Sequence, residues 1–453
     1  MLSRGVESTR MINVIVSARI FPMTKSNLLL LIVLLFLSQA GIGMGRAQDT
    51  PAQASIPAIP IQPDDVLTWQ NGQFHLGGKP FAEISFNKFD LLWAIHDSLI
   101  ASEKKHDPSL LQKAVARQDS ALRDLHSMGF RTIRIFGAPW GPFATTWSDP
   151  AARKQLFEAV DTTLDLCEKN QIQVVYSLGL GGFASGADST QVSPLYADPN
   201  SDARQRCYGY IDAMVSRYKN RKAIAMWEVS NELTLAADIG VYKGKLQPSL
   251  PQVAAFLDAT AQRIKQNDSL RLVSTGGSCL RASTWHRWHE KSWTLDTLDQ
   301  YKESYAAFFE HSAIDVVDSH YYELKVGGVK LAPGPDGKDV MMTPASFMQI
   351  VLALGKAPII GEYGTLPSGW VNEKTDPDWF QGYDDANAIE WVQKGLNELV
   401  DAKVPITYWW AYQSDRPVDQ KANPVVFSLE TTPDLVKRIA EANRLLKSRL
   451  GTQ

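Results

Sequence analysis

The sequence has few cysteines, little charge imbalance and hardly any long hydrophobic run. Its three cysteines, Cys167, Cys207 and Cys279, are too few for a disulfide-stabilised scaffold, although a Cys207–Cys279 bridge stays open. A net charge of −3 leaves no basic excess to bind a polyanion, which argues against nucleic acid as a partner. With 44% hydrophobic and 21% charged residues, the composition is globular and excludes a disordered, collagen-like or multi-span membrane chain.

The one long apolar run lies near the N-terminus. Residues 28–37 read LLLLIVLLFL, Lys25 precedes them, and Gly45-Arg46-Ala47 supplies small residues after them. This pattern predicts a secretory signal peptide over residues 1–47, with Met23 as an alternative start, and the run is shorter than the ~20 residues that span a bilayer. An uncleaved anchor is the alternative. Cleavage would remove five basic residues and one acidic residue and change the net charge from −3 to −7, as suits a secreted or periplasmic protein.

The segment that follows the signal pattern is rich in proline, alanine and glutamine. Residues 48–63 therefore predict a flexible linker, followed by a single domain that covers residues 64–453. Just inside this domain, Asn71-Gly72 and Gly77-Gly78 separate short alternating runs, and both pairs are typical of tight hairpin turns. We expect a short N-terminal β-hairpin cap ahead of the main fold.

A unit of strand, loop and amphipathic helix recurs along the rest of the chain. Eight short apolar runs alternate with helix-like stretches at intervals of roughly 40 to 50 residues. Such alternation predicts a parallel sheet, and eight units predict a closed (β/α)8 TIM barrel of the α/β class. No Gly-x-Gly-x-x-Gly follows any run, which argues against a dinucleotide-binding fold. The runs begin near Phe81, Arg131, Ile172, Ala223, Arg271, Ile314, Pro358 and Pro405.

Two glutamates stand at the ends of predicted strands. The fourth run leads into Asn231-Glu232, and the seventh ends in Gly361-Glu362-Tyr363. Because active sites of such barrels lie at the C-terminal ends of the strands, both carboxylates should reach one rim from nearly opposite sides. A facing pair of carboxylates is what cleavage of a glycosidic bond requires. One holds a proton for the departing oxygen, and the other is ionised to attack or stabilise the anomeric carbon.

The position of Asn231-Glu232 after a predicted strand, rather than the Asn-Glu dipeptide itself, indicates a catalytic role for Glu232. The dipeptide also occurs as Asn372-Glu373, in a polar loop, and as Asn397-Glu398, in a helical stretch where we expect a solvated helix face. Only Asn231-Glu232 follows a strand-like run. A salt bridge at the rim is the alternative interpretation of Glu232.

Other predicted strand ends carry polar side chains. Arg134 lies on the second strand, and an arginine inside a barrel needs a carboxylate partner, for which Glu362 is our candidate and another acid the alternative. On the sixth strand, Tyr322 is placed to donate a hydrogen bond to the attacking carboxylate. His320 is placed to bind a sugar hydroxyl or to orient the acid. Ordinary aromatic packing is the alternative for this pair.

Aromatic side chains are frequent at the same rim. The eighth run carries Trp409-Trp410, and because strand side chains alternate, only one of the two faces the interior. We favour Trp410 as the floor beneath the sugar ring. Further tryptophans in the rim loops predict stacking platforms for a sugar chain, with packing inside the loops as the alternative. They are Trp140, Trp147, Trp285, Trp288, Trp293, Trp370 and Trp379.

Two other function classes stay open. His286 and His289 lie three residues apart, but no cluster of histidines and carboxylates falls on the strand ends, so we expect no metal site and no cofactor. A non-catalytic sugar-binding barrel would keep the aromatic rim and lose one of the two glutamates, yet both are present.

As an ordered set, these residues resemble glycoside hydrolase family 5 of clan A, which contains retaining cellulases and β-mannanases. The matching positions fall on strands 2, 4, 6, 7 and 8, and the likeness spans residues 64–450. They are Arg134, Asn231-Glu232, His320-x-Tyr322, Glu362 and Trp410. The opening FAEISFNKFDLLW, with Asn87, is similar to the mannanase-like branch. Many members carry a histidine at the end of strand three, where this sequence reads VVYSLGLGGF, so the substrate stays open.

The resemblance implies a role for each matching residue. Glu232 would be the acid/base, Glu362 the nucleophile and Asn231 the ligand of the sugar 2-hydroxyl, while Arg134 and Tyr322 would hold the nucleophile. The implied activity is a secreted retaining β-glycoside hydrolase that cleaves β-linked hexose polysaccharides or oligosaccharides. Mannan endo-1,4-β-mannosidase activity is favoured, and a cellulase or β-glucanase of the same family is the alternative.

Overall fold

The computed structural model describes residues 61–138, 143–184, 193–237, 247–322, 328–364, 388–413, 429 and 432–452. The predicted signal peptide, nearly all of the predicted linker, Asn372-Glu373, Trp140, Trp370 and Trp379 lie outside these residues. Within the described part of the chain, no helix is both long and apolar enough to cross a membrane.

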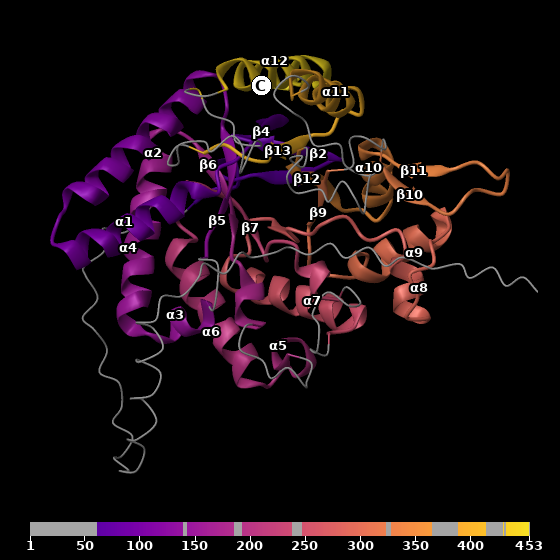
Figure 1. Cartoon of the computed structure of the whole chain (residues 1–453), viewed down its shortest axis with the longest axis horizontal. Coiled ribbons are helices and arrows are strands. Elements are labelled where there is room, and N and C mark those ends of the chain that lie inside the picture. The colour runs from indigo at the N-terminus through magenta and orange to yellow at the C-terminus, as the bar shows by residue number, and fades with distance from the viewer. Residues whose placement is uncertain are drawn as a thin grey trace, which may run out of the picture. The chain divides into compact units, whose positions relative to one another are not determined.

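Eight parallel strands close into a barrel in the order β12-β13-β4-β5-β6-β7-β8-β9. This confirms the predicted (β/α)8 fold, and each strand lies within or at the edge of its predicted run. Figure 1 shows the strands in the interior and the helices around them. The strands are β4 (Glu83–Asn87), β5 (Thr132–Phe136), β6 (Gln173–Ser177), β7 (Ile224–Glu228), β8 (Val273–Ser274), β9 (Val316–Tyr321), β12 (Ala357–Tyr363) and β13 (Ile406–Trp409).

Several helices begin at a residue whose side chain caps them. Asp149 accepts a hydrogen bond from the Ala151 N–H at the start of α4, and Ser249 forms a capping box with Gln252 at the start of α7. The longer helices are α1 (Asp90–Lys105), α2 (Ser109–Ser127), α4 (Pro150–Lys169), α6 (Asp202–Tyr218), α7 (Leu250–Asn267), α9 (Leu298–Phe309), α10 (Pro344–Ala353), α11 (Ala388–Asp401) and α12 (Pro433–Leu450). The shorter ones are α3 (Phe143–Ser148), α5 (Pro194–Ala197) and α8 (Thr284–His289).

Three features of the connections stand out. The first connection holds two long helices, α1 and α2, and His106 ends α1 in the left-handed conformation. The last helix, α12, packs on β4, where the Asn443 side chain accepts a hydrogen bond from the Ile84 N–H at 3.1 Å. A separate antiparallel pair, β10 (Val329–Leu331) with β11 (Val340–Met342), lies in the connection between β9 and β12.

The N-terminal cap closes the bottom of the barrel. It has three antiparallel strands, β1 (Thr68–Gln70), β2 (Gln73–Leu76) and β3 (Lys79–Pro80), one more than the predicted hairpin. The cap residues Leu67, Phe74 and Phe81 share one buried cluster with barrel side chains. Those partners lie at the start or in the middle of their strands and include Val175, Met226, Val316, Ala357 and Ile406. The apolar plug at this end leaves the opposite rim as the open end of the barrel.

The structure decides two alternatives that the sequence left open. All three cysteines are free, so Cys207 and Cys279 form no disulfide. Trp147 is buried against Phe157 and Tyr210, because α3 turns its indole into the helical layer, so it packs the loop and offers no platform.

Candidate active site

The centre of the open rim is an arginine surrounded by carboxylates. The guanidinium of Arg134 is fully buried, and its Nε and Nη2 donate to both oxygens of Glu228 at 2.7 and 2.8 Å. Its Nη1 donates to Glu362 Oε1 at 2.9 Å, so the contact expected between these two residues is present. Burial lowers the pKa of Arg134, but the charges of Glu228 and Glu362 outweigh burial and raise it. The guanidinium is therefore permanently charged and fixed in orientation.

Two asparagines complete the coordination of this guanidinium. Asn87, at the end of β4, accepts from Arg134 Nη1 at 2.9 Å and donates to the Gly361 carbonyl at 2.8 Å. Asn231 accepts from Arg134 Nη2 through its side-chain oxygen at 2.8 Å. Because Arg134 holds the oxygen of the Asn231 amide, the amide nitrogen is the end left for a sugar hydroxyl.

Glu362 is clamped from both sides. Its Oε1 accepts from Arg134, and its Oε2 accepts from the Tyr322 hydroxyl at 2.5 Å. Burial raises the pKa of Glu362 above its ordinary value, and the charge of Arg134 and the Tyr322 hydrogen bond offset part of this rise. Burial also lowers the pKa of His320 to about 4, so the imidazole is neutral near pH 7 and Arg134 is the cation that favours the ionised carboxylate.

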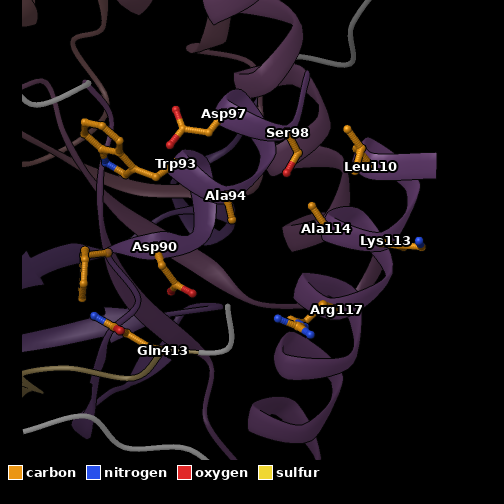
Figure 2. Close-up of a pocket in the computed structure, with 11 residues that line it drawn as sticks. Asp90, Trp93, Ala94, Asp97, Ser98, Leu110, Lys113, Ala114, Arg117 and Gln413 are labelled. Carbon is orange, nitrogen blue, oxygen red and sulfur yellow. The ribbon is translucent and has the colours of Figure 1, made fainter. Parts of the chain in front are cut away.

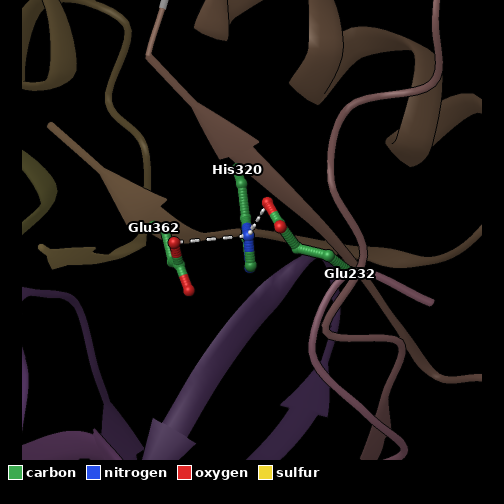
Figure 3. A group of neighbouring side chains, drawn as sticks. All are labelled: Glu232, His320 and Glu362. Carbon is green, nitrogen blue, oxygen red and sulfur yellow. Dashed lines mark hydrogen bonds and ion pairs between the residues drawn. The ribbon is translucent and has the colours of Figure 1, made fainter. Parts of the chain in front are cut away.

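Glu232 meets Glu362 across the side chain of His320 (Figure 3). His320 Nδ1 lies 2.9 Å from Glu232 Oε1 and 3.5 Å from Glu362 Oε2. Oxygens of the two glutamates and this nitrogen all lie within 4.8 Å of one another. The Glu232 side chain is 28% exposed, against 6% for Glu362, so Glu232 is the one that faces the open rim.

The backbone around Glu232 is specialised. Glu232 has a φ of +48°, a left-handed conformation that is uncommon for glutamate and is found at functional sites. Its N–H donates to the Gly276 carbonyl at 2.7 Å. A Cβ at Gly276 would come within 2.1 Å of the Ser230 carbonyl oxygen, so only glycine allows the loop after β8 to pass so close.

The aromatic floor is built by residues at the end of β5 and just after β4 and β13. Trp410 is half-buried and stacks on Phe89, with ring centroids 5.0 Å apart and an angle of 11°. Phe136 lies 5.8 Å from Trp410 and under the guanidinium of Arg134. Trp409, by contrast, is fully buried against Tyr363. The alternation expected for this pair is thus present, with Trp410 on the side of the site.

Two acids in the site were not singled out in the sequence. Glu228 is the bidentate partner of Arg134, and Asp318 lies below His320 with its Oδ2 3.9 Å from His320 Nε2. Burial, reinforced by the charge of Glu228, raises the pKa of Asp318 well above its usual range. Strand alternation was the available signal for Asp318, because it lies two residues before His320 on β9 and so shares its face.

Glu232, His320 and Glu362 form the one cluster in the described residues that could hold a metal ion, and each offers a ligand atom. The expectation that histidines and carboxylates do not cluster at the strand ends was therefore wrong. However, both oxygens of Glu362 already accept hydrogen bonds, and a guanidinium 2.9 Å away repels a divalent cation. These contacts favour an acid–base role for the cluster over metal binding.

The remaining expectations concern residues away from the cluster. Asn397-Glu398 lies on α11 as expected, but only Asn397 is exposed. Glu398 is half-buried and accepts a hydrogen bond from the Tyr363 hydroxyl at 2.8 Å, so the expectation of a fully solvated face was wrong there. Trp293 is 46% exposed, and its ring lies against the guanidinium of Arg287.

The fold has relatives among solved structures. No protein-family model matches the chain, and no curated protein sequence matches it significantly. The chain is similar to the endo-1,4-β-mannanase from Rhizomucor miehei at 15% identity, with a TM-score of 0.58 over 84% of this chain and 99% of that one.

Two further structures show the same likeness. One is a glycoside hydrolase family 5 mannosidase from Rhizomucor miehei, with 15% identity, a TM-score of 0.55 and coverage of 85% of this chain and 100% of that one. The other is the hyperthermostable endo-1,4-β-D-mannanase from Thermotoga petrophila RKU-1, with 14% identity, a TM-score of 0.51 and coverage of 81% and 100%. At these identities the likeness establishes the shared barrel fold.

Proposed function

We propose that this protein is a retaining β-glycoside hydrolase of the family 5 type that cleaves β-linked hexose chains. The observation that carries the proposal is the approach of Glu232 and Glu362 to within 4.8 Å at the open rim of the barrel. Carboxyl groups about 5–5.5 Å apart are typical of retaining enzymes, whereas inverting enzymes hold them about 6.5–9.5 Å apart to admit a water.

Glu362 is the proposed nucleophile because two hydrogen-bond donors hold its carboxylate and offset part of the effect of burial on its pKa. Arg134 and Tyr322 orient its two oxygens, and the carboxylate is buried at the base of the site. One oxygen attacks the anomeric carbon, and the bond from that carbon to the departing oxygen breaks. The sugar is then held as a covalent ester on Glu362.

Glu232 is the proposed acid/base because it is the more exposed of the pair and contacts a neutral imidazole. With the His320 proton on Nε2, Nδ1 accepts a hydrogen bond from protonated Glu232 at 2.9 Å and orients the acid. Glu232 gives this proton to the departing oxygen. It then takes a proton from a water, which attacks the ester and releases Glu362.

The remaining residues position the sugar. Trp410 supplies an apolar face beside the two glutamates, suited to stacking on a sugar ring. Asn231, with its oxygen fixed by Arg134, presents its amide nitrogen to the 2-hydroxyl. A hydrogen bond to this hydroxyl that strengthens in the transition state contributes several kcal/mol in such reactions.

Mannan is the favoured substrate, and glucan is the alternative. The structural neighbours with TM-scores above 0.5 that are described above are mannan-cleaving enzymes, and the first strand resembles the mannanase-like branch. A panel of β-mannan, glucomannan, cellulose-type and β-1,3-glucan polymers, with products sized by chromatography, tests this proposal. Release of oligomers from mannan supports it, release from cellulose-type polymer alone reassigns the substrate, and binding to all without new reducing ends indicates a non-catalytic barrel.

Chemical rescue tests the two glutamate roles separately. Glu362→Ala should abolish turnover, and added azide should then give a glycosyl azide of inverted configuration on an activated substrate. Glu232→Gln should slow substrates with poor leaving groups most, because good leaving groups need no proton. Normal turnover by Glu362→Ala would show that the nucleophile assignment is wrong.

We also propose that the protein is exported through its N-terminal segment. The apolar run at residues 28–37 and the small residues up to Ala47 support this step. N-terminal sequencing of the protein recovered from a secreting host should give a start near residue 48, and an intact Met1 or Met23 on the exported protein would contradict cleavage.

A further inference from the structure

A cavity of about 560 Å³ opens beside the candidate active site, between α1 and α2. Figure 2 shows Trp93 and Gln413 along one side of it and Lys113 and Arg117, from α2, along the other. Phe89, which follows β4, lines it as well. A cavity of this size falls within the range that protein pockets use for organic ligands, about 300–1,000 Å³.

The cavity is continuous with the aromatic floor of the site. Phe89 lines the cavity and also stacks on Trp410, and Gln413 follows Trp410 by three residues. The ring of Phe136 contacts both Trp410 and the guanidinium of Arg134. A row of aromatic rings therefore leads from the two glutamates to the cavity, as a chain-like ligand would require.

The chemistry of the lining suits a neutral ligand with many hydroxyl groups. Two acids, Asp90 and Asp97, balance two bases, Lys113 and Arg117, so neither an anion nor a cation is favoured. Asp90 is bound by Lys88. Asp97 lies 3.7 Å from His96 Nδ1, and its side chain is 70% exposed, so it remains accessible as an acceptor.

Trp93 supplies the most specific feature. Its indole is half-buried and lines the cavity, so part of its apolar face is open to a ligand. An aromatic face of this kind is suited to stacking on a sugar ring.

The strand order indicates the direction in which a bound sugar chain would run. In the closed barrel, β13 lies opposite β7, and β4 lies opposite β8. Glu232 follows β7, whereas the cavity lies beyond the ends of β13 and β4. The departing part of a substrate lies next to the acid that protonates it, so the part that stays bound to Glu362 extends the other way, towards the cavity.

We propose that the α1–α2 cavity binds sugar units on the non-reducing side of the cleaved bond, distant from the bond itself, with Trp93 as the principal contact. This inference rests on the proposed function and adds to it a specificity-determining subsite. Its consequence is that cleavage should be faster, and its position more uniform, when a substrate has enough units on that side to reach Trp93.

The test compares the parent with Trp93→Ala on β-1,4-linked manno- and gluco-oligosaccharides of three to six units, labelled at the reducing end. For the longest substrate that is cleaved, Trp93→Ala should lower kcat/KM about tenfold, which corresponds to about 1.4 kcal/mol, and should move the cleaved bond towards the non-reducing end. For the shortest, the change should be less than twofold. Trp93→Phe should recover part of the loss. Trp69→Ala, at a half-buried tryptophan of the cap at the opposite end of the barrel, should match the parent in kcat/KM.

The outcomes separate the two proposals. Equal kcat/KM for parent and Trp93→Ala at every length overturns the subsite, and so does an equal loss at every length. Calorimetric binding of the six-unit chains to Glu362→Ala, with and without Trp93→Ala, gives an independent readout. Chains that bind through Trp93 but that the parent never cleaves would support the subsite and overturn the hydrolase, whereas chains that neither bind nor are cleaved would overturn both.

Discussion

The bidentate pair between Arg134 and Glu228 predicts a specific cost for Glu228→Gln. The substitution keeps the shape of the side chain, removes one buried negative charge and turns one acceptor oxygen into an amide that faces the Arg134 donors. Arg134 keeps Glu362, Asn87 and Asn231 as partners, so no charge is left wholly unpaired.

The size of the effect follows from these contacts. A hydrogen bond to a charged group contributes about 1.5–3 kcal/mol, and removing one partner of a buried pair costs about 3–5 kcal/mol when the other charge is left alone. Because Arg134 retains Glu362, we expect a loss of about 2–3 kcal/mol. For a domain of about 390 residues, an unfolding entropy near 2.1 cal/mol/K per residue converts this into a fall in Tm of about 3 °C.

Calorimetric unfolding and steady-state kinetics measure both consequences. The fall in Tm should be accompanied by a drop of about tenfold in kcat/KM, because Arg134 orients the nucleophile and loses part of its own support. The matched control is Glu158→Gln, which removes an acid from an exposed i,i+4 pair with Lys154 and should change stability by less than about 0.5 kcal/mol. If Glu228→Gln behaves like this control in both assays, the bidentate pair does not hold the site together.

Three further predictions concern the same cluster. Tyr322→Phe removes a hydrogen bond of 2.5 Å to Glu362 and should lower kcat/KM about 10–100-fold. Because that hydrogen bond lowers the pKa of Glu362, its loss should also move the acid limb of the pH profile to higher pH. An unmoved limb would contradict this role. Asp318 has a raised pKa, so its contribution to the free energy of unfolding is present at low pH and is lost as the pH rises through that pKa. Asp318→Asn should therefore show a smaller fall in Tm from acidic to alkaline pH than the parent. An equal fall in both proteins would contradict this prediction. Dialysis against EDTA should leave turnover unchanged, and a loss restored by Zn²⁺ or Mn²⁺ would instead assign Glu232, His320 and Glu362 to a metal.

The barrel could be predicted from the sequence because its signals are periodic and local. Each strand is a short apolar run, and every one of the eight runs contains a barrel strand or leads directly into one. The convergence of Glu232 and Glu362 followed from that topology alone, since strand ends in a parallel barrel share one rim. Their distance did not follow, because it depends on the left-handed backbone of Glu232 and the loop after β8.

The polar network beneath the glutamates was harder to predict. Arg134 was expected to need a carboxylate, but sequence spacing does not distinguish Glu362 from Glu228, and the fork of the guanidinium takes both. The α1–α2 cavity was not predictable either. It is lined by residues of α1, α2 and the segments after β4 and β13, and no local sequence pattern specifies how these pack together.

A covalent intermediate on Glu362 is the most direct test of the central claim. A 2-deoxy-2-fluoro β-glycosyl donor with an activated leaving group slows release of the sugar and should trap the ester, which peptide mass spectrometry can locate. We predict one fluoro-sugar on Glu362 in the parent and in Glu232→Gln, and none in Glu362→Ala. Attachment to another residue, or turnover that gives product of inverted configuration with no adduct, would contradict the account.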